Sequence, residues 1–99
     1  MDFLNATQFL DGTNYAVWKI RMRVALMATG ADIWKSVVTG YTPPKKLKIL
    51  TQKYAKKNNS MAMETMLHGL TYSIREKIRK YTSAKELWLK LEYLYATET

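Results

Sequence analysis

The stretch LDGTNYAVWKIRMRVALMATG, residues 10–30, decides the fold. An irregular lead-in, residues 1–12, ends at the first glycine of this stretch, Gly12. The short polar side chain of Thr13 or Asn14 is suited to cap the first free amides of a helix. We expect this helix to run up to Gly30, which supplies a left-handed stop.

This helix has two apolar faces when its residues are placed on a 100° wheel. The first face carries Tyr15, Trp18, Met22, Ala25 and Leu26, and the second, nearly opposite, carries Val17, Ile20, Val24 and Met27. Such a helix either is buried on both sides or keeps one apolar face for another molecule. Because a helix that is apolar all round is usually interior, we expect burial on both sides.

The next segments also read as helices. A short helix from Asp32 to about Val38 is ended by Gly40 and the prolines that follow it. A lysine-rich helix comes next, with Leu47, Leu50 and Tyr54 on one face. It either breaks at the polar triplet 58–60 or passes through it, and the periodicity leaves both open.

Two capping boxes mark the last helices. Ser73 and Ser83 are each followed three residues later by a glutamate, so helices are expected to begin near both serines. The final helix should run to about Ala96, with Leu89 and Tyr93 together on its outer side. No segment alternates as a strand would. The sequence therefore predicts one all-α domain, residues 1–99, a compact bundle of five or six helices.

Positive charge gathers in the middle of the chain. The formal net charge is +8, and residues 33–63 contain seven lysines and no acidic residue. One-sided charge of this kind attracts polyanions, with RNA and DNA the obvious candidates. The alternative is a solvated face that keeps the domain soluble, and the sequence leaves the two open.

The candidate nucleic-acid contacts are basic side chains of this stretch and of the helix near Ser73. They are Lys45, Lys46, Lys48, Lys53, Lys56, Lys57, Arg75, Lys77, Arg79 and Lys80. Lysine outnumbers arginine, and we expect no exposed aromatic residue among the lysines. Binding would then use phosphates without base readout or stacking.

Catalytic and metal chemistry find no support in the residue pattern. The chain has no cysteine, which excludes disulfides and thiolate zinc sites, and His68 is its single histidine. No pair of carboxylates suggests an acid–base couple, and no glycine-rich loop forms a phosphate cradle. We expect a non-enzymatic protein with no metal, no cofactor and no small-molecule substrate.

Two features bear on location. The longest apolar run, residues 24–28, is far shorter than the ~20 residues that cross a bilayer. The N-terminus has no basic segment followed by an apolar stretch. We therefore expect a cytoplasmic protein with no membrane partner.

Residues 10–18 resemble the L-x-G-x-N-Y-x-x-W opening of Gag proteins from copia-type LTR retrotransposons. Ile33, Trp34 and Gly40 match the next element of that family. Residues 83–95 are similar to its T-A-K-E-x-W-x-x-L-x-x-x-Y segment, with serine in place of threonine at the first position. The resemblance spans about residues 9–95. Tyr54 stands where the family commonly has tryptophan, and Asn59 where it commonly has aspartate.

The resemblance implies a capsid-type N-terminal domain that is a building unit of RNA-containing virus-like particles. The family's second helical lobe and zinc knuckle are not found in these residues. The chain is thus interpreted as an excised N-terminal domain or as a shortened, host-adopted relative that binds another protein. Its expected self-association residues are Val17, Ile20, Val24, Met27, Leu89 and Tyr93. Its expected core residues are Tyr15, Trp18, Met22, Leu26, Trp34, Trp88, Leu91 and Tyr95.

Overall fold

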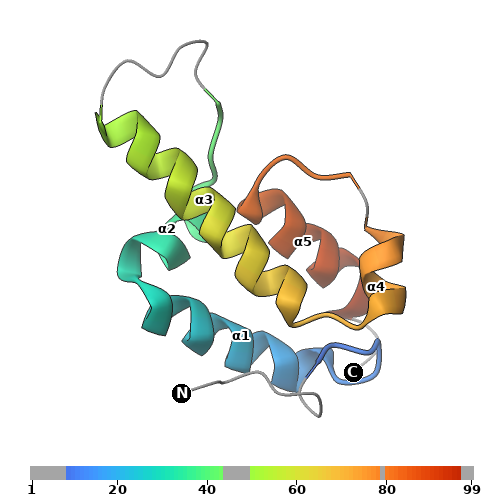
Figure 1. Ribbon diagram of the computed structural model, residues 1–99. Helices are drawn as coiled ribbons and strands as arrows, with labels where there is room; N and C mark the ends of the chain where they lie inside the picture. The colour runs from blue at the N-terminus through green and yellow to red at the C-terminus, as the bar shows by residue number, and fades with distance from the viewer. Residues whose placement is uncertain (1–8, 44–49, 79, 97–99) are drawn as a thin grey trace.

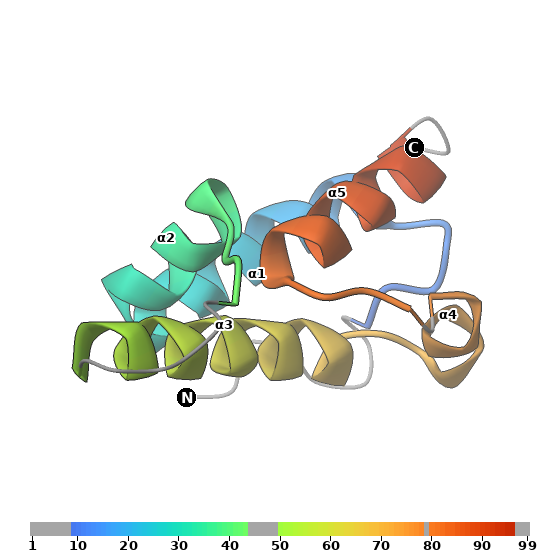
Figure 2. The same ribbon diagram turned by 90° about the horizontal axis from the view of Figure 1, so that it is seen from above.

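The computed structural model describes residues 9–43, 50–78 and 80–96, which form five helices and no strand. These are α1 (Tyr15–Thr29), α2 (Ala31–Thr39), α3 (Leu50–His68), α4 (Tyr72–Lys77) and α5 (Ala84–Tyr95). Helices α1, α2 and α5 pack against one side of α3, and α4 lies beyond its C-terminal end (Figure 1, Figure 2). The all-helical prediction is confirmed for this part of the chain.

Helix α1 has the predicted bounds, but the residue before it does not cap it with its side chain. Asn14 is the N-cap residue, yet its Oδ1 accepts from the backbone amide of Asp11 at 3.1 Å. Its Nδ2 donates to the carbonyl of Phe9 at 3.0 Å. Gly12, within this turn, has a φ of +100°, a conformation that other residues rarely adopt. The asparagine therefore shapes the turn that leads into α1.

The expected left-handed stop at Gly30 is wrong, because this residue has a φ of 167° and is extended. Its amide donates to the carbonyl of Leu26 at 3.2 Å, and its own carbonyl accepts from Ile33 at 3.0 Å. Gly30 thus ends α1 and begins α2 without a loop between them. A glycine with positive φ follows α2 instead, at Gly40, where φ is +85°.

Helix α3 passes through the polar triplet 58–60 without a break. Asn59 is only 3% exposed, and its Oδ1 accepts from the amide of Ala84 at 2.8 Å. That amide is one of the free donors at the start of α5, so a buried side chain of α3 caps another helix. The bond fixes the middle of α3 against the first turn of α5.

The capping box expected at Ser83 is present in shifted form. The Oγ of Ser83 accepts from the amide of Glu86 at 3.1 Å, as predicted. The carboxylate of Glu86 reaches back to Thr82, accepting from its amide at 3.0 Å and its hydroxyl at 3.1 Å. The amide of Ala84 is left to Asn59, so residues of α3 and of the preceding turn together cap the N-terminus of α5.

The capping box expected at Ser73 is wrong. Helix α4 begins at Tyr72 after Thr71, which stays extended and makes no side-chain cap. The amide of Thr71 donates to the carbonyl of Leu10 at 3.1 Å, so the parallel bridge between Leu10 and Leu70 holds this segment extended. Ser73 lies in the first turn of the helix and is exposed.

The core is built mainly from one face of each helix. Its buried residues include Leu10, Tyr15, Trp18, Met22, Leu26, Ile33, Val37, Met66, Leu70, Ile74, Leu87, Leu91 and Tyr95. Trp18, Trp88 and Trp34 join α1, α5 and α2 through ring contacts, with centroids 6.1 Å apart for the first pair and 5.3 Å for the second. Trp34 and Trp88 are half-buried and pack on this core. Aromatic contacts of this kind hold the helix pairs in register.

Substitution of Asn59 by alanine is expected to lower the free energy of unfolding by about 1–3 kcal/mol, because it leaves the buried amide of Ala84 without a partner. Asn58→Ala is the matched control, since the side chain of Asn58 is half-exposed and makes no hydrogen bond among the described residues. Urea unfolding followed by circular dichroism measures both. Equal stabilities for the two variants would contradict the role of Asn59.

Candidate interaction surfaces

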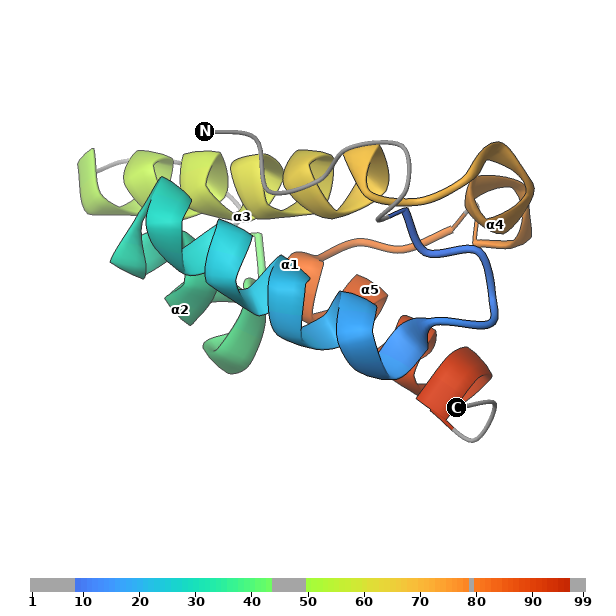
Figure 3. The ribbon, with the colours of Figure 1, turned by 90° about the horizontal axis from the view of Figure 1, so that it is seen from below.

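Helix α1 presents four apolar side chains to solvent. Val17 is 57% exposed, Ile20 59%, Val24 43% and Met27 52%, and we refer to these four as the α1 stripe. Their spacing of three, four and three residues is that of a coiled-coil seam. Figure 3 looks onto α1, which lies on the outside of the bundle in that view. The α1 stripe is therefore an exposed apolar surface.

The expectation that α1 is buried on both sides is wrong. Its inner face, with Tyr15, Trp18 and Met22, is fully covered by the core. Because α2 and α3 pack on that face, no described element covers the α1 stripe. The two apolar faces therefore have different roles, one in folding and one available for contact.

Leu89 and Tyr93 lie on the outer side of α5, 48% and 80% exposed. The Nζ of Lys90 lies 5.7 Å from the centroid of the Tyr93 ring. Near this pair, α5 is joined to α1 by an ion pair between Lys19 and Glu92, at 3.3 Å with both side chains 43% exposed. An ion pair this open contributes little stability, so its value is in positioning.

The basic residues expected to contact nucleic acid fall into separate groups. Lys53, Lys56 and Lys57 are exposed and share one side of α3, at positions i, i+3 and i+4. Arg75, Lys77 and Lys80 are exposed on α4 or just after it. Lys45, Lys46, Lys48 and Arg79 lie outside the described residues. The structure thus places three lysines together on α3.

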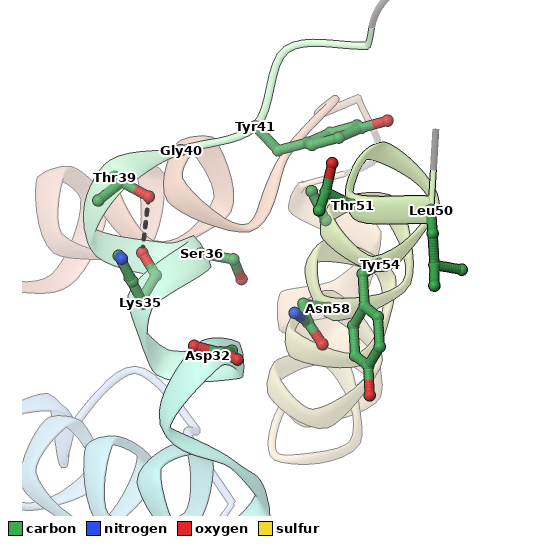
Figure 4. Close-up of a pocket in the computed structure, with 11 residues that line it drawn as sticks. Asp32, Lys35, Ser36, Thr39, Gly40, Tyr41, Leu50, Thr51, Tyr54 and Asn58 are labelled. Atoms are coloured by element: carbon green, nitrogen blue, oxygen red, sulfur yellow. Dashed lines mark hydrogen bonds between the residues drawn. The ribbon is translucent and has the colours of Figure 1, made fainter. Parts of the chain in front are cut away.

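Sequence reasoning missed a groove of about 570 Å³ between α2 and the first half of α3. Figure 4 shows Asp32 and Ser36 of α2 pointing across it toward Asn58 of α3. Tyr41 and Tyr54 also line the groove. Lining residues from two helices and the chain after α2 share no sequence pattern, so only folding reveals this site.

The side chain of Tyr54 overturns one expectation. It is 58% exposed, and Leu50 on the same face is 74% exposed. Lys53 and Lys57 flank Tyr54 on α3 and are also exposed. An exposed aromatic ring is therefore interleaved with the lysines, contrary to the expectation from sequence.

The described residues hold no group of three or more histidine, aspartate and glutamate side chains that could bind a metal. None of the described helices combines the length and the apolar character that a membrane crossing requires. His68 is exposed at the end of α3. Asp11 accepts from the hydroxyl and amide of Thr13, and these bonds lower the pKa of its carboxyl. Asp11 is thus a turn residue.

No protein family, curated protein or solved structure matches this chain. The resemblance to copia-type Gag proteins therefore depends on the two motifs at residues 10–18 and 83–95 and on Ile33, Trp34 and Gly40 between them. In the structure both motifs have structural roles. The first forms the turn and the inner face of α1, and the second forms the cap and the inner face of α5.

Tyr15 is the one buried side chain of the described residues whose polar atom has no hydrogen-bond partner. Burial, with a smaller effect from the charge of Glu92, raises the pKa of Tyr15 from 10.0 to about 12. Burial also raises the pKa of Tyr81 and of Tyr95. These shifts come from core packing and indicate no acid–base chemistry.

The substitution Tyr15→Phe is expected to increase the free energy of unfolding at neutral pH by about 1 kcal/mol, since it removes a buried hydroxyl that has no partner. The raised pKa adds a second signature. Below pH 10, Tyr15 is protonated in both the folded and the unfolded state. As pH rises from 10 toward 12, only the unfolded state ionises, so the free energy of unfolding falls over this range. The wild type should therefore lose stability more steeply over that range than the variant.

Thermal unfolding at several pH values measures both effects. Tyr93→Phe is the control. Because Tyr93 is 80% exposed, removal of its hydroxyl should leave the free energy of unfolding unchanged at every pH tested. A wild-type curve parallel to that of Tyr15→Phe above pH 10 would contradict the assignment.

Proposed function

We propose that this chain is a capsid-type domain, similar to the N-terminal domain of copia-type Gag. It would assemble with copies of itself as a non-enzymatic building unit of RNA-containing virus-like particles. The observation that carries this proposal is the α1 stripe. Four apolar side chains at coiled-coil spacing, each about half exposed, are typical of a surface that packs against a partner helix.

The expected contact is weak for a single pair. Covering four half-exposed apolar side chains contributes on the order of 1 kcal/mol for each, from the transfer free energy of apolar surface. Association costs several kcal/mol in lost translation and rotation, which offsets most of that gain. A particle repeats the contact many times, so modest pairwise affinity is sufficient for assembly.

Charge acts against this assembly. Each copy carries a formal charge of +8, and α1 contributes three basic residues and no acidic residue to it. Salt screens repulsion between like charges at the surface. Self-association should therefore strengthen as ionic strength rises, which is the opposite of the trend for nucleic-acid binding.

For the first test, nuclease-treated protein is examined by sedimentation velocity from micromolar to millimolar concentration. We expect dimers or larger species to appear as concentration rises, and Val24→Gln to shift that transition at least about tenfold higher, which corresponds to 1.4 kcal/mol. A neutral replacement leaves the net charge unchanged. Val38→Gln is the matched control, because Val38 is 54% exposed but lies on α2.

Two results would contradict the proposal. A wild type that stays monomeric at every concentration would show that this domain does not assemble alone. Equal effects of Val24→Gln and Val38→Gln would show that association does not use the α1 stripe. Parallel variants Leu89→Gln and Tyr93→Gln determine whether α5 takes part.

A second candidate function is RNA binding through phosphate contacts. It is favoured by the three exposed lysines on one side of α3, in a stretch without acidic residues. Such a cluster attracts phosphates and releases bound counterions when it binds. Binding of this kind needs no base recognition.

Replacement of Lys53, Lys56 and Lys57 together by glutamine is expected to reduce the salt dependence of RNA binding. Each phosphate contact contributes about 0.7 to the slope of log K against log salt for a single strand, so the slope should become shallower by about 2. Fluorescence anisotropy with a labelled oligonucleotide measures it. The double variant Lys85→Gln/Lys90→Gln on α5 is the control. An unchanged slope in the triple variant would remove this candidate.

A further inference from the structure

The groove between α2 and α3 combines an exposed ring, unpartnered polar groups and surrounding positive charge. We propose that it binds one base of a single-stranded nucleic acid, with Tyr54 as the stacking platform. This inference rests on the second candidate function, phosphate binding by the α3 lysines, and adds to it a subsite for a base. The proposed subsite shares no residue with the α1 stripe.

The size of the groove suits a nucleotide. Its volume is about 570 Å³, within the ~300–1,000 Å³ that small-ligand pockets usually have. Tyr54 lies at its border on α3, and the ring of Tyr41 extends from the end of α2 toward α3 (Figure 4).

Charge selects the class of ligand. Lys35 lines the groove, and Lys53 and Lys57 flank Tyr54 on the same helix. Two tyrosines and one carboxylate could otherwise hold an ammonium group, but the nearby lysines disfavour a cation. A ligand with a ring and a negative charge satisfies both the tyrosine and the lysines. Single-stranded nucleic acid has this chemistry, because its bases are unpaired and its phosphates are charged.

Two polar side chains that line the groove can form hydrogen bonds with the edge of a base. The side chains of Asp32 and Asn58 have no hydrogen-bond partner among the described residues, and both line the groove. The amide of Asn58 offers a donor and an acceptor, whereas the carboxylate of Asp32 only accepts. Unpaired bases present N–H donors on their Watson–Crick edge, which gives Asp32 a role within a basic surface.

A duplex should not use this subsite. Its bases are already stacked and paired, so a ring on the protein surface has no free base face to contact. Phosphate contacts by the lysines remain available to both forms. A stacking subsite therefore predicts a preference for single strands over duplexes, whereas phosphate contacts alone predict binding of both forms.

The test uses fluorescence anisotropy with a labelled single strand of about 12 nucleotides, within the usual site sizes for such binding, and with its duplex. Tyr54→Leu is expected to weaken binding of the single strand about tenfold, as loss of one stacked base does. Binding of the duplex and the salt dependence should stay unchanged. Tyr54→Phe, which keeps the ring, should bind like the wild type.

Tyr72→Leu is the matched control, since Tyr72 is an exposed tyrosine on α4 and is not among the residues that line the groove. A tenfold loss in Tyr54→Leu with none in Tyr72→Leu supports the subsite. Equal single-strand affinities of Tyr54→Leu and the wild type would overturn it, as would an equal loss for single strand and duplex.

Amide chemical shifts locate the bound strand directly. Shifts at Ser36 and Asn58 on adding the oligonucleotide support the groove, and shifts confined to Lys53, Lys56 and Lys57 overturn it. The two proposals fail separately. Loss of the salt slope in the lysine variant with no effect of Tyr54→Leu leaves phosphate binding intact and removes only the base subsite. A wild type that binds no oligonucleotide removes both.

Discussion

The carbonyl of Gly69 is the point on which the rest of this structure depends. It accepts from the amide of Leu10 at 2.8 Å and from the indole Nε1 of Trp18 at 2.9 Å. The carbonyl of Leu10 in turn accepts from Thr71. Both donors at Gly69 come from more than fifty residues earlier in the chain, and the acceptor is buried. Breaking these bonds would leave buried polar groups without partners, which lowers the free energy of unfolding.

This arrangement fixes how α1 is rotated about its own axis. Because the indole of Trp18 must reach Gly69, the face of α1 that carries Trp18 points inward and the α1 stripe points to solvent. The opposite rotation would bury the α1 stripe and leave the indole Nε1–H of Trp18 without Gly69 as its partner. The candidate self-association surface is therefore a consequence of a single buried hydrogen bond and the packing around it.

Much of the fold follows from local sequence signals. The bounds of α1 and α5 follow from the residues before Tyr15, from Gly30 and from the serine cap at Ser83. Other features depend on partners distant in sequence. Asn59 belongs to a polar triplet at which the sequence leaves open whether the helix breaks or continues, and its buried partner, the amide of Ala84, lies 25 residues further along the chain.

The candidate sites also differ in how far the sequence predicts them. The α1 stripe and the lysines are visible in the sequence as a periodic face and a charge cluster, but periodicity alone does not predict that one apolar face of α1 is buried and the other exposed. The groove is not visible at all. It is lined by residues of α2, of α3 and of the chain after α2, and so depends on how these segments pack.

The two proposed surfaces are linked by electrostatics. They lie on different helices, α1 and α3, so one copy can use both at once. Copies that each carry +8 repel one another, and a bound polyanion neutralises part of that charge. A nucleic acid held on α3 would thus lower the cost of bringing α1 stripes together. By linkage, assembly would in turn raise the affinity for the strand, because each neighbour adds its own lysines along the same molecule.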